Sequence, residues 1–344
     1  MSTSILFITF IILSVVSYFL VSGILRWTSR RKILDIPNER SSHDRPVPKG
    51  GGISIVLLTI GGVWIFYFIY SSLFRIDWII YFTLGGLLTA VISLIDDIYS
   101  VRNIIRFFVH SLTAVFIIAG IGYINEFSFP LTENLYLKYA GVIVTFLFIT
   151  GLTNAYNFMD GIDGIAAIQA IVAGAGWLLI GYIYSDPLVL ILGLFIAASS
   201  MGFLFHNWHP AKIFMGDVGS AFLGFVFAVL IVISAQHDPN LLFAGVLFVW
   251  PFLFDTVYTL FRRLSHGENI FEAHRSHLYQ RLVIAGWEHG SVATLYGVLA
   301  FAGWVPVMVM LLGIKVWYML TFFIPIVLFI LLLIITTQYE KRYA

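Results

Sequence analysis

The sequence has 344 residues, of which 60% are hydrophobic and 11% are charged, and its mean hydropathy is +0.95. A chain this apolar cannot keep its surface in water, so a soluble single-core protein is excluded and an integral membrane protein is predicted. The formal net charge is only +1, and the lack of cysteine excludes disulfides and thiolate chemistry.

Eleven apolar runs follow one another along the chain, most of them of about twenty residues, which as a helix cross roughly 30 Å of hydrocarbon. They lie near residues 4–25, 53–74, 78–95, 104–124, 139–154, 164–184, 187–205, 219–235, 241–261, 291–313 and 316–337. The first has no basic residue before it and no small-residue cleavage site after it, which predicts a retained helix, not a removed signal peptide. No repeat or linker divides the chain. The predicted fold is therefore all-α and polytopic, with residues 1–344 as a single integral membrane domain.

The basic residues are distributed very unevenly between alternate loops. One set of loops holds sixteen of the 19 Lys and Arg residues, whereas the other holds only Arg75, Lys138 and Lys315. Because cytoplasmic loops are enriched in Lys and Arg, this split places the N-terminus outside and the C-terminus in the cytoplasm. This topology accounts for the basic residues, so no nucleic-acid partner is predicted, and it places them beside the headgroups of the membrane lipids.

The first predicted inside segment, residues 26–52, contains Asp35-Ile36-Pro37-Asn38 and ends at Gly50-Gly51-Gly52. Glycines at the start of a helix let backbone N–H groups approach an anion such as a phosphate. The alternative, which this motif alone favours, is a basic cytoplasmic loop with a glycine turn.

Asp96 and Asp97 follow the third span, with Arg102 and Arg106 just beyond. Two adjacent carboxylates at a helix C-terminus oppose the helix dipole and each other, so a positive group must offset them. Mg²⁺, which commonly uses one or two carboxylates plus substrate phosphates, fits this requirement. An interfacial pair neutralised by one of the two arginines fits it equally well.

The fifth span ends in the most specific string of the chain, Asn154 to Gly164. If the helix persists, a spacing of three places Asn154, Asn157, Asp160 and Asp163 at neighbouring positions. Asp163 could instead cap the sixth helix, but a cap explains one of four polar residues, so a functional role is favoured.

Two further inside segments carry polar motifs. Residues 206–220 contain Asp217, which adds a carboxylate to the same face, although Asp217 or Ser220 could simply cap the eighth span. His206 and His209 are predicted to be interfacial or hydrogen-bonded residues and not ligands.

Residues 272–281 contain His274 and His277, which could bind phosphate or assist proton transfer, although a basic helix on the headgroups is the better interpretation of this segment alone. Asp255 is predicted to be an intramembrane ion-pair or packing residue.

Taken together, these motifs resemble the polyprenyl-phosphate N-acetylhexosamine-1-phosphate transferase family (glycosyltransferase family 4). The resemblance rests on five strings in order, over most of the chain: Asp35 to Asn38 with Gly50 to Gly52, Asp96-Asp97, Asn154 to Gly164, Phe214 to Ser220, and His274 to His277. It implies a multi-pass bacterial inner-membrane enzyme with a cytoplasmic active site. Such enzymes use Mg²⁺, with Mn²⁺ possible, to move a sugar 1-phosphate from a UDP-sugar to a polyprenyl phosphate such as undecaprenyl phosphate, releasing UMP.

The resemblance also implies roles for individual residues. Asp217, supported by Asp97, is similar to the metal ligand, and Asp96 with Asp97 to the catalytic pair. His274 and His277 match a catalytic histidine loop near the diphosphate. The positions similar to those around the nucleotide are Asn154, Asn157, Asp160, Asp163, Asn207 and Phe214. The groups expected to neutralise phosphate charge are Arg45, Lys49, His274 and Arg275. Two reaction paths are open: direct attack, or attack through an aspartyl-phosphate on Asp96 or Asp97.

One departure from the family pattern concerns the histidine loop, where Ser276 stands in place of a third histidine. This favours the branch that serves O-antigen and related surface polysaccharides, with UDP-N-acetylhexosamine as substrate. The oligomeric state is open, with a homodimer as one possibility.

The rival function is an ion-coupled transporter, which typically places its sites at mid-membrane, whereas these acids lie at one boundary. A structural scaffold leaves the acids unexplained.

Overall fold

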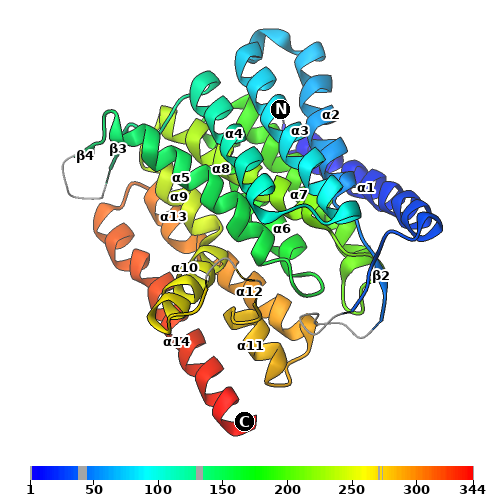
Figure 1. Cartoon of the computed structure of the whole chain (residues 1–344). Coiled ribbons are helices and arrows are strands. Elements are labelled where there is room, and N and C mark those ends of the chain that lie inside the picture. The colour runs from blue at the N-terminus through cyan, green and yellow to red at the C-terminus, as the bar shows by residue number, and fades with distance from the viewer. Residues whose placement is uncertain (1, 38–44, 129–134, 270–271, 273, 344) are drawn as a thin grey trace.

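The computed structural model describes residues 2–37, 45–128, 135–269, 272 and 274–343 (Figure 1). Asn38 of the first motif lies outside the described residues. The helices are α1 (Thr3–Arg31), α2 (Ile53–Ile69), α3 (Ile76–Tyr99), α4 (Asn103–Gly120), α5 (Ala140–Phe158), α6 (Ile165–Ile183), α7 (Pro187–Asn207), α8 (Asp217–His237), α9 (Leu241–Phe248), α10 (Trp250–Ser265), α11 (Leu278–Ile284), α12 (His289–Ala302), α13 (Trp304–Leu311) and α14 (Lys315–Tyr343), with a short 3₁₀ turn, η1 (Ser71–Leu73). Two short antiparallel hairpins pair β1 (Leu34–Asp35) with β2 (Val47–Pro48) and β3 (Glu126–Phe127) with β4 (Leu135–Tyr136).

The predicted all-α, polytopic fold is confirmed, with one exception among the spans. In the part of the chain that the structure describes, nine helical stretches are long and apolar enough to cross a membrane, and α2 is a shorter apolar helix of 17 residues. The predicted span over 241–261 is broken, because it consists of α9 and α10, which meet at a bend of 76°. Pro251 lies in the first turn of α10, where its missing N–H suits a new helix start and would interrupt a continuous one.

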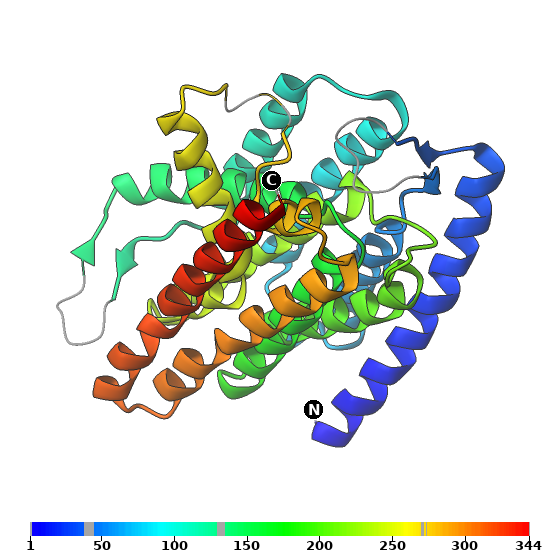
Figure 2. The same cartoon turned by 90° about the horizontal axis from the view of Figure 1, so that it is seen from below.

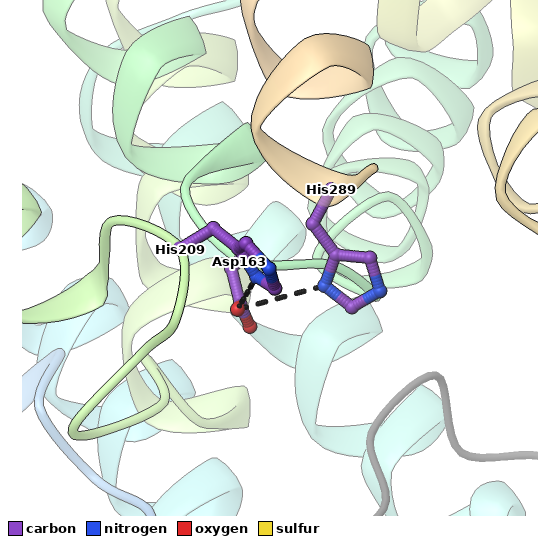
Figure 3. Close-up of side chains that lie close together, drawn as sticks. All are labelled: Asp163, His209 and His289. Atoms are coloured by element: carbon purple, nitrogen blue, oxygen red, sulfur yellow. Dashed lines mark hydrogen bonds and ion pairs between the residues drawn. The ribbon is translucent and has the colours of Figure 1, made fainter. Parts of the chain in front are cut away.

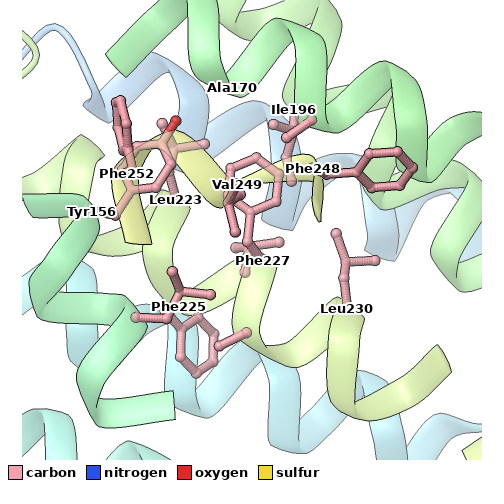
Figure 4. Packing of buried hydrophobic residues seen from close by; sticks show 14 of the residues in the cluster. Tyr156, Ala170, Ile196, Leu223, Phe225, Phe227, Leu230, Phe248, Val249 and Phe252 are labelled. Atoms are coloured by element: carbon pink, nitrogen blue, oxygen red, sulfur yellow. The ribbon is translucent and has the colours of Figure 1, made fainter. Parts of the chain in front are cut away.

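Helix α8 forms the centre of the bundle. Every residue from Val218 to Ser234 is buried, and α8 packs against α2, α3, α5, α7 and α9. Its aromatic side chains, among them Phe225 and Phe227, fill the space between these helices (Figure 4). Because α8 is apolar on all sides, every face of it can pack against a neighbouring helix.

The outermost helices expose apolar side chains. Helix α1 and helix α14 lie on opposite sides of the bundle (Figure 2). Phe7 and Phe19 of α1 are 65% and 66% exposed, and Phe323 of α14 is 55% exposed. So much outward apolar surface is stable in lipid but not in water, so the helix bundle itself requires a membrane.

Candidate active site

The polar ends of the first eight helices meet at one end of the bundle, because consecutive helices run in opposite directions. Contacts there join the C-terminal end of α3 to the N-terminal end of α8, and the residue before α6 to the last residue of α7. The predicted inside segments therefore gather on one face, whereas the compartment that this face meets stays a prediction.

The glycines before α2 serve close packing. The Gly51 N–H donates to the Phe214 carbonyl at 3.0 Å and the Gly52 N–H to the Met215 carbonyl at 2.9 Å. A Cβ at Gly52 would lie 2.3 Å from the Gly219 Cα, so only glycine allows this approach. Both N–H groups are therefore already hydrogen-bonded, which supports the glycine turn that the motif alone favoured over an anion site.

Asp97 caps a helix that begins 120 residues further along the chain. Its Oδ1 accepts the Asp217 N–H at 3.2 Å and its Oδ2 accepts the Val218 N–H at 3.1 Å. Gly216, at φ 76°, makes room for this contact, because a Cβ there would lie 2.6 Å from the Asp97 Oδ2. The predicted cap of α8 by Asp217 or Ser220 is thus replaced by a carboxylate from α3, placed where the helix dipole favours an anion. The Lys49 Nζ lies 3.7 Å from Asp97 Oδ1.

Arg106 joins the other two acids of the predicted catalytic group. Its Nη1 forms an ion pair with Asp96 and also lies 2.6 Å from the Asp217 Oδ2. Its Nη2 donates to Asn103 in the first turn of α4 at 2.8 Å. Neutralisation of Asp96 by an arginine, one of the two interpretations of the sequence, is therefore present. The bridge to Asp217 was not predicted, since nothing in the sequence places Arg106 beside a residue 111 positions away.

The string that follows α5 is a turn and not a continued helix. Helix α5 ends at Phe158, so the ladder predicted from the spacing of three is wrong beyond Asn157. Burial and the nearby carboxylates Asp217, Asp97 and Asp163 raise the pKa of Asp160 well above its usual range. Asp160 therefore belongs to the same group of acids, and its ionised form would be favoured only beside a cation.

Two of the predicted nucleotide residues hold helices together. The Asn157 Oδ1 accepts the Ser220 hydroxyl at 2.5 Å, joining α5 to α8. Asn207 is buried, and it accepts the Gly164 N–H at 2.9 Å and donates to the Ile213 carbonyl at 3.0 Å. Both contacts fix the loops around the acids.

The other predicted binding residues differ in exposure. Asn154 donates to the Thr150 carbonyl at 2.7 Å within α5. Phe214 is half-buried and its backbone pairs with Pro48 of β2. Arg45 is exposed, whereas Lys49 and Arg275 are half-buried.

Asp163 is not the N-cap of α6, because Gly164 occupies that position. Its Oδ2 instead lies 2.6 Å from His209 Nδ1 and accepts the Ala211 N–H at 3.1 Å, and His289 Nδ1 lies 3.5 Å away (Figure 3). Burial alone would raise the pKa of Asp163, but the hydrogen bonds from His289, His209 and Ala211 lower it below its usual value. The prediction that His209 is hydrogen-bonded is confirmed.

The histidine loop is organised by Asp255. This carboxylate is fully buried, and its Oδ1 lies 3.1 Å from the Nδ1 of His277, which is itself 4% exposed. Of the two roles predicted for Asp255, ion-pair or packing residue, the buried polar packing is present. Its remaining hydrogen-bond donors are the N–H groups of Leu278 (2.9 Å) and Tyr279 (3.2 Å) and the hydroxyls of Thr259 (3.1 Å) and Tyr296 (2.5 Å). This arrangement ties α10, α11 and α12 together and places His277 as a support for the loop.

His274 is neutral in this environment. Burial, with the nearby His277 and Arg263, lowers the pKa of His274 to about 4. Its Nδ1 lies 2.9 Å from the Ser276 hydroxyl and its ring lies 5.1 Å from that of His277. The role of His274 toward a phosphate stays a prediction, and Arg275 is a cationic residue of the same loop whose charge does not depend on a shifted pKa.

Comparison with known proteins identifies the class. A sequence model described as glycosyl transferase family 4 matches residues 79–235. The chain is 32% identical over 267 residues to a probable undecaprenyl-phosphate N-acetylglucosaminyl 1-phosphate transferase of Bacillus subtilis, covering 76% of this chain and 73% of the relative. It is 27% identical to a decaprenyl-phosphate N-acetylglucosaminephosphotransferase of Mycobacterium tuberculosis, covering 84% and 79%. It is also 29% identical to a phospho-N-acetylmuramoyl-pentapeptide-transferase of Hydrogenobaculum, covering 68% and 71%.

A multi-helix membrane bundle with clustered carboxylates at one end is thus the architecture of a membrane-bound sugar-phosphate transferase. The chain belongs to the polyprenyl-phosphate N-acetylhexosamine-1-phosphate transferases of glycosyl transferase family 4. This membership confirms the resemblance stated from the motifs and decides against the transporter.

Proposed function

We propose that this protein transfers an N-acetylhexosamine 1-phosphate from a UDP-sugar to undecaprenyl phosphate and releases UMP, at the cytoplasmic face of the bacterial inner membrane. The observation that carries the proposal is the meeting of Asp96, Asp97, Asp160 and Asp217, from three separate parts of the chain, with Arg106. Phosphoryl transfer between two anions needs positive charge, because the two phosphates repel each other, and a divalent cation held by these carboxylates would supply it.

The donor chemistry at this site fits Mg²⁺. All the acids offer carboxylate oxygens, which Mg²⁺ prefers. Asp217 is more exposed than Asp96 and Asp97, with 32% of its side chain accessible. We assign Asp217 as the principal ligand, oriented by the contact between Asp97 and the first N–H groups of α8. When bound, Mg²⁺ would neutralise charge on the diphosphate.

In the proposed reaction, an oxygen of the lipid phosphate attacks the β-phosphorus of the UDP-sugar. A new P–O bond forms there while the bond from the β-phosphorus to the bridging oxygen breaks, and that oxygen leaves with UMP. Lys49 and Arg275 supply positive charge to the phosphates, and Arg45 on the exposed loop attracts the lipid headgroup. Neutral His274 contributes a hydrogen bond and not a charge.

For the sugar, we propose an N-acetylhexosamine used in O-antigen-type surface polysaccharides. This rests on Ser276, which occupies the place of a third histidine and contacts His274. Purified protein supplied with undecaprenyl phosphate, Mg²⁺ and single UDP-sugars should form lipid product with UDP-N-acetylhexosamines and not with UDP-N-acetylmuramoyl-pentapeptide. Product from the pentapeptide substrate alone would overturn this assignment.

The test of the site is the variant Asp217→Asn. It should lower UMP release by at least about 10²-fold, the typical cost of removing one electrostatic contact in a transition state, while the protein still inserts and purifies normally. Asp77→Asn is the matched control, because Asp77 is an exposed carboxylate in the first turn of α3, at the end remote from Asp97. EDTA should abolish turnover and Mg²⁺ should restore it. Normal turnover by Asp217→Asn would refute the proposal.

A further inference from the structure

A second cluster of potential metal ligands lies beside the candidate active site. Among the described residues, Asp163, His209 and His289 each direct one ligand atom to a common point, and the three atoms lie within 4.8 Å of one another (Figure 3). They come from the turn before α6, the loop between α7 and α8, and the first residue of α12. Three separate segments therefore supply ligands to one place.

One of these atoms has an unmet requirement. His289 is 8% exposed, and among the described residues its buried Nδ1 has no polar contact shorter than the long one of 3.5 Å to Asp163 Oδ2. A buried polar nitrogen without a close partner costs free energy, and a ligand there would remove that cost. His209, with 41% of its side chain exposed, leaves a route from solvent to the cluster.

The chemistry of the cluster differs from that of the acids around Asp217. Two imidazole nitrogens and one carboxylate oxygen suit Zn²⁺ and related transition metals, whereas Mg²⁺ prefers oxygen alone. Tetrahedral ligands at about 2.0–2.2 Å from Zn²⁺ lie roughly 3.3–3.5 Å apart. The distance of 3.5 Å from His289 Nδ1 to Asp163 Oδ2 already matches this spacing. The contact of 2.6 Å from His209 would open by less than about 1 Å, a rotation of one exposed ring.

We propose that Asp163, His209 and His289 form a site for a divalent transition metal of the zinc class, with the fourth position open to water. Such a metal would connect the Asp160–Asp163 turn to the α7–α8 loop and to α12. The proposal does not depend on the transferase activity, because the metal is measured without UDP-sugar or lipid.

The experiment uses the full-length protein in detergent, purified without a polyhistidine tag and stripped with a chelator. Co²⁺ and then Zn²⁺ are titrated in excess Mg²⁺, which occupies oxygen-only sites. We expect one Co²⁺ per chain with visible ligand-field absorption, displaced by Zn²⁺. His209→Gln and His289→Gln should each weaken Zn²⁺ binding at least about tenfold, since even the loss of a residue that only hydrogen-bonds a metal ligand lowers metal affinity by that factor.

The matched control is His237→Gln, because His237 pairs with Asp186 outside this cluster and should not alter binding. Unchanged Zn²⁺ affinity in both cluster variants, or loss of it in the control alone, would overturn the proposal. If a cluster variant does not fold, the wild-type Co²⁺ spectrum decides: absence of four-coordinate absorption, with Mg²⁺ present, would also overturn it.

Discussion

Asp96 and Asp97 are adjacent residues with different surroundings, which the sequence alone could not distinguish. Asp97 is buried and accepts two N–H groups of α8, whereas Asp96 pairs with Arg106 and accepts the Val101 N–H. Adjacent positions in a helix point about 100° apart, so one side chain faces the core and the other the loop. We infer that Asp97 mainly positions Asp217.

Replacing Asp97 by Ala should destabilise the protein by about 3 kcal/mol, because one buried and one partly buried N–H group lose their acceptor. Asp97→Asn keeps one acceptor oxygen and should lose less. Asp77→Ala, which removes an exposed ion pair with Arg75, should change stability by at most about 1 kcal/mol. Denaturant unfolding in detergent measures all three variants. Equal stability of Asp97→Ala and Asp77→Ala would contradict the capping role.

The lowered pKa of His274 predicts a dependence of stability on pH. The unfolded chain binds a proton near pH 6.5 but the folded protein only near pH 4, so acidification through this window favours unfolding. His274→Gln removes this titration. Between pH 7 and about pH 4.5, the variant should therefore lose less thermal stability than the wild type. An equal loss of melting temperature in the variant and the wild type over this pH range would show that the pKa of His274 is not lowered in the folded protein.

At the scale of elements, glycine decides how closely α2 approaches α8. Gly52 has helical dihedrals, φ −62° and ψ −17°, so the need for glycine is one of space and not of backbone strain. A methyl group would meet backbone atoms of Gly219 at 2.3 Å, and a backbone cannot rotate away as a side chain can.

Gly52→Ala should therefore destabilise the protein by about 3 kcal/mol, at the upper end of overpacking. Gly61→Ala, in the same helix, has nothing within 4 Å of its new methyl group and should be neutral or up to about 1 kcal/mol stabilising. The comparison needs only melting temperatures and UMP release of the two variants. A tolerated Gly52→Ala would mean that the two helix ends lie further apart.

For the whole molecule, the predicted orientation can be tested directly, because the chain contains no cysteine. Lys212→Cys reports the predicted cytoplasmic face, and Arg75→Cys and Lys138→Cys report the opposite face; all three positions are exposed. In spheroplasts, a membrane-impermeant maleimide should label positions 75 and 138, and position 212 only after lysis. Labelling of position 212 in sealed spheroplasts would reverse the assigned orientation.

Features that depend on local pattern were predictable. Apolar runs predicted where the apolar helices of the described residues lie, including the shorter α2, because a helix in lipid must satisfy its own backbone groups. The exception was 241–261, where the apolar run hides the break at Pro251. The order of the motifs also identified the family, since each motif is a continuous string.

Features that depend on distant contacts needed the tertiary structure. Arg106 and Asp217, Asp97 and Val218, and His289 and Asp163 are pairs separated by more than a hundred residues. A run of letters states which side chains are present, but the packing of α3, α8 and α12 determines which of them share a proton, a helix end or a cation. The motifs in the sequence were therefore sufficient to identify the transferase family. The contacts that each acid and histidine makes depend on how the helices pack in the folded bundle.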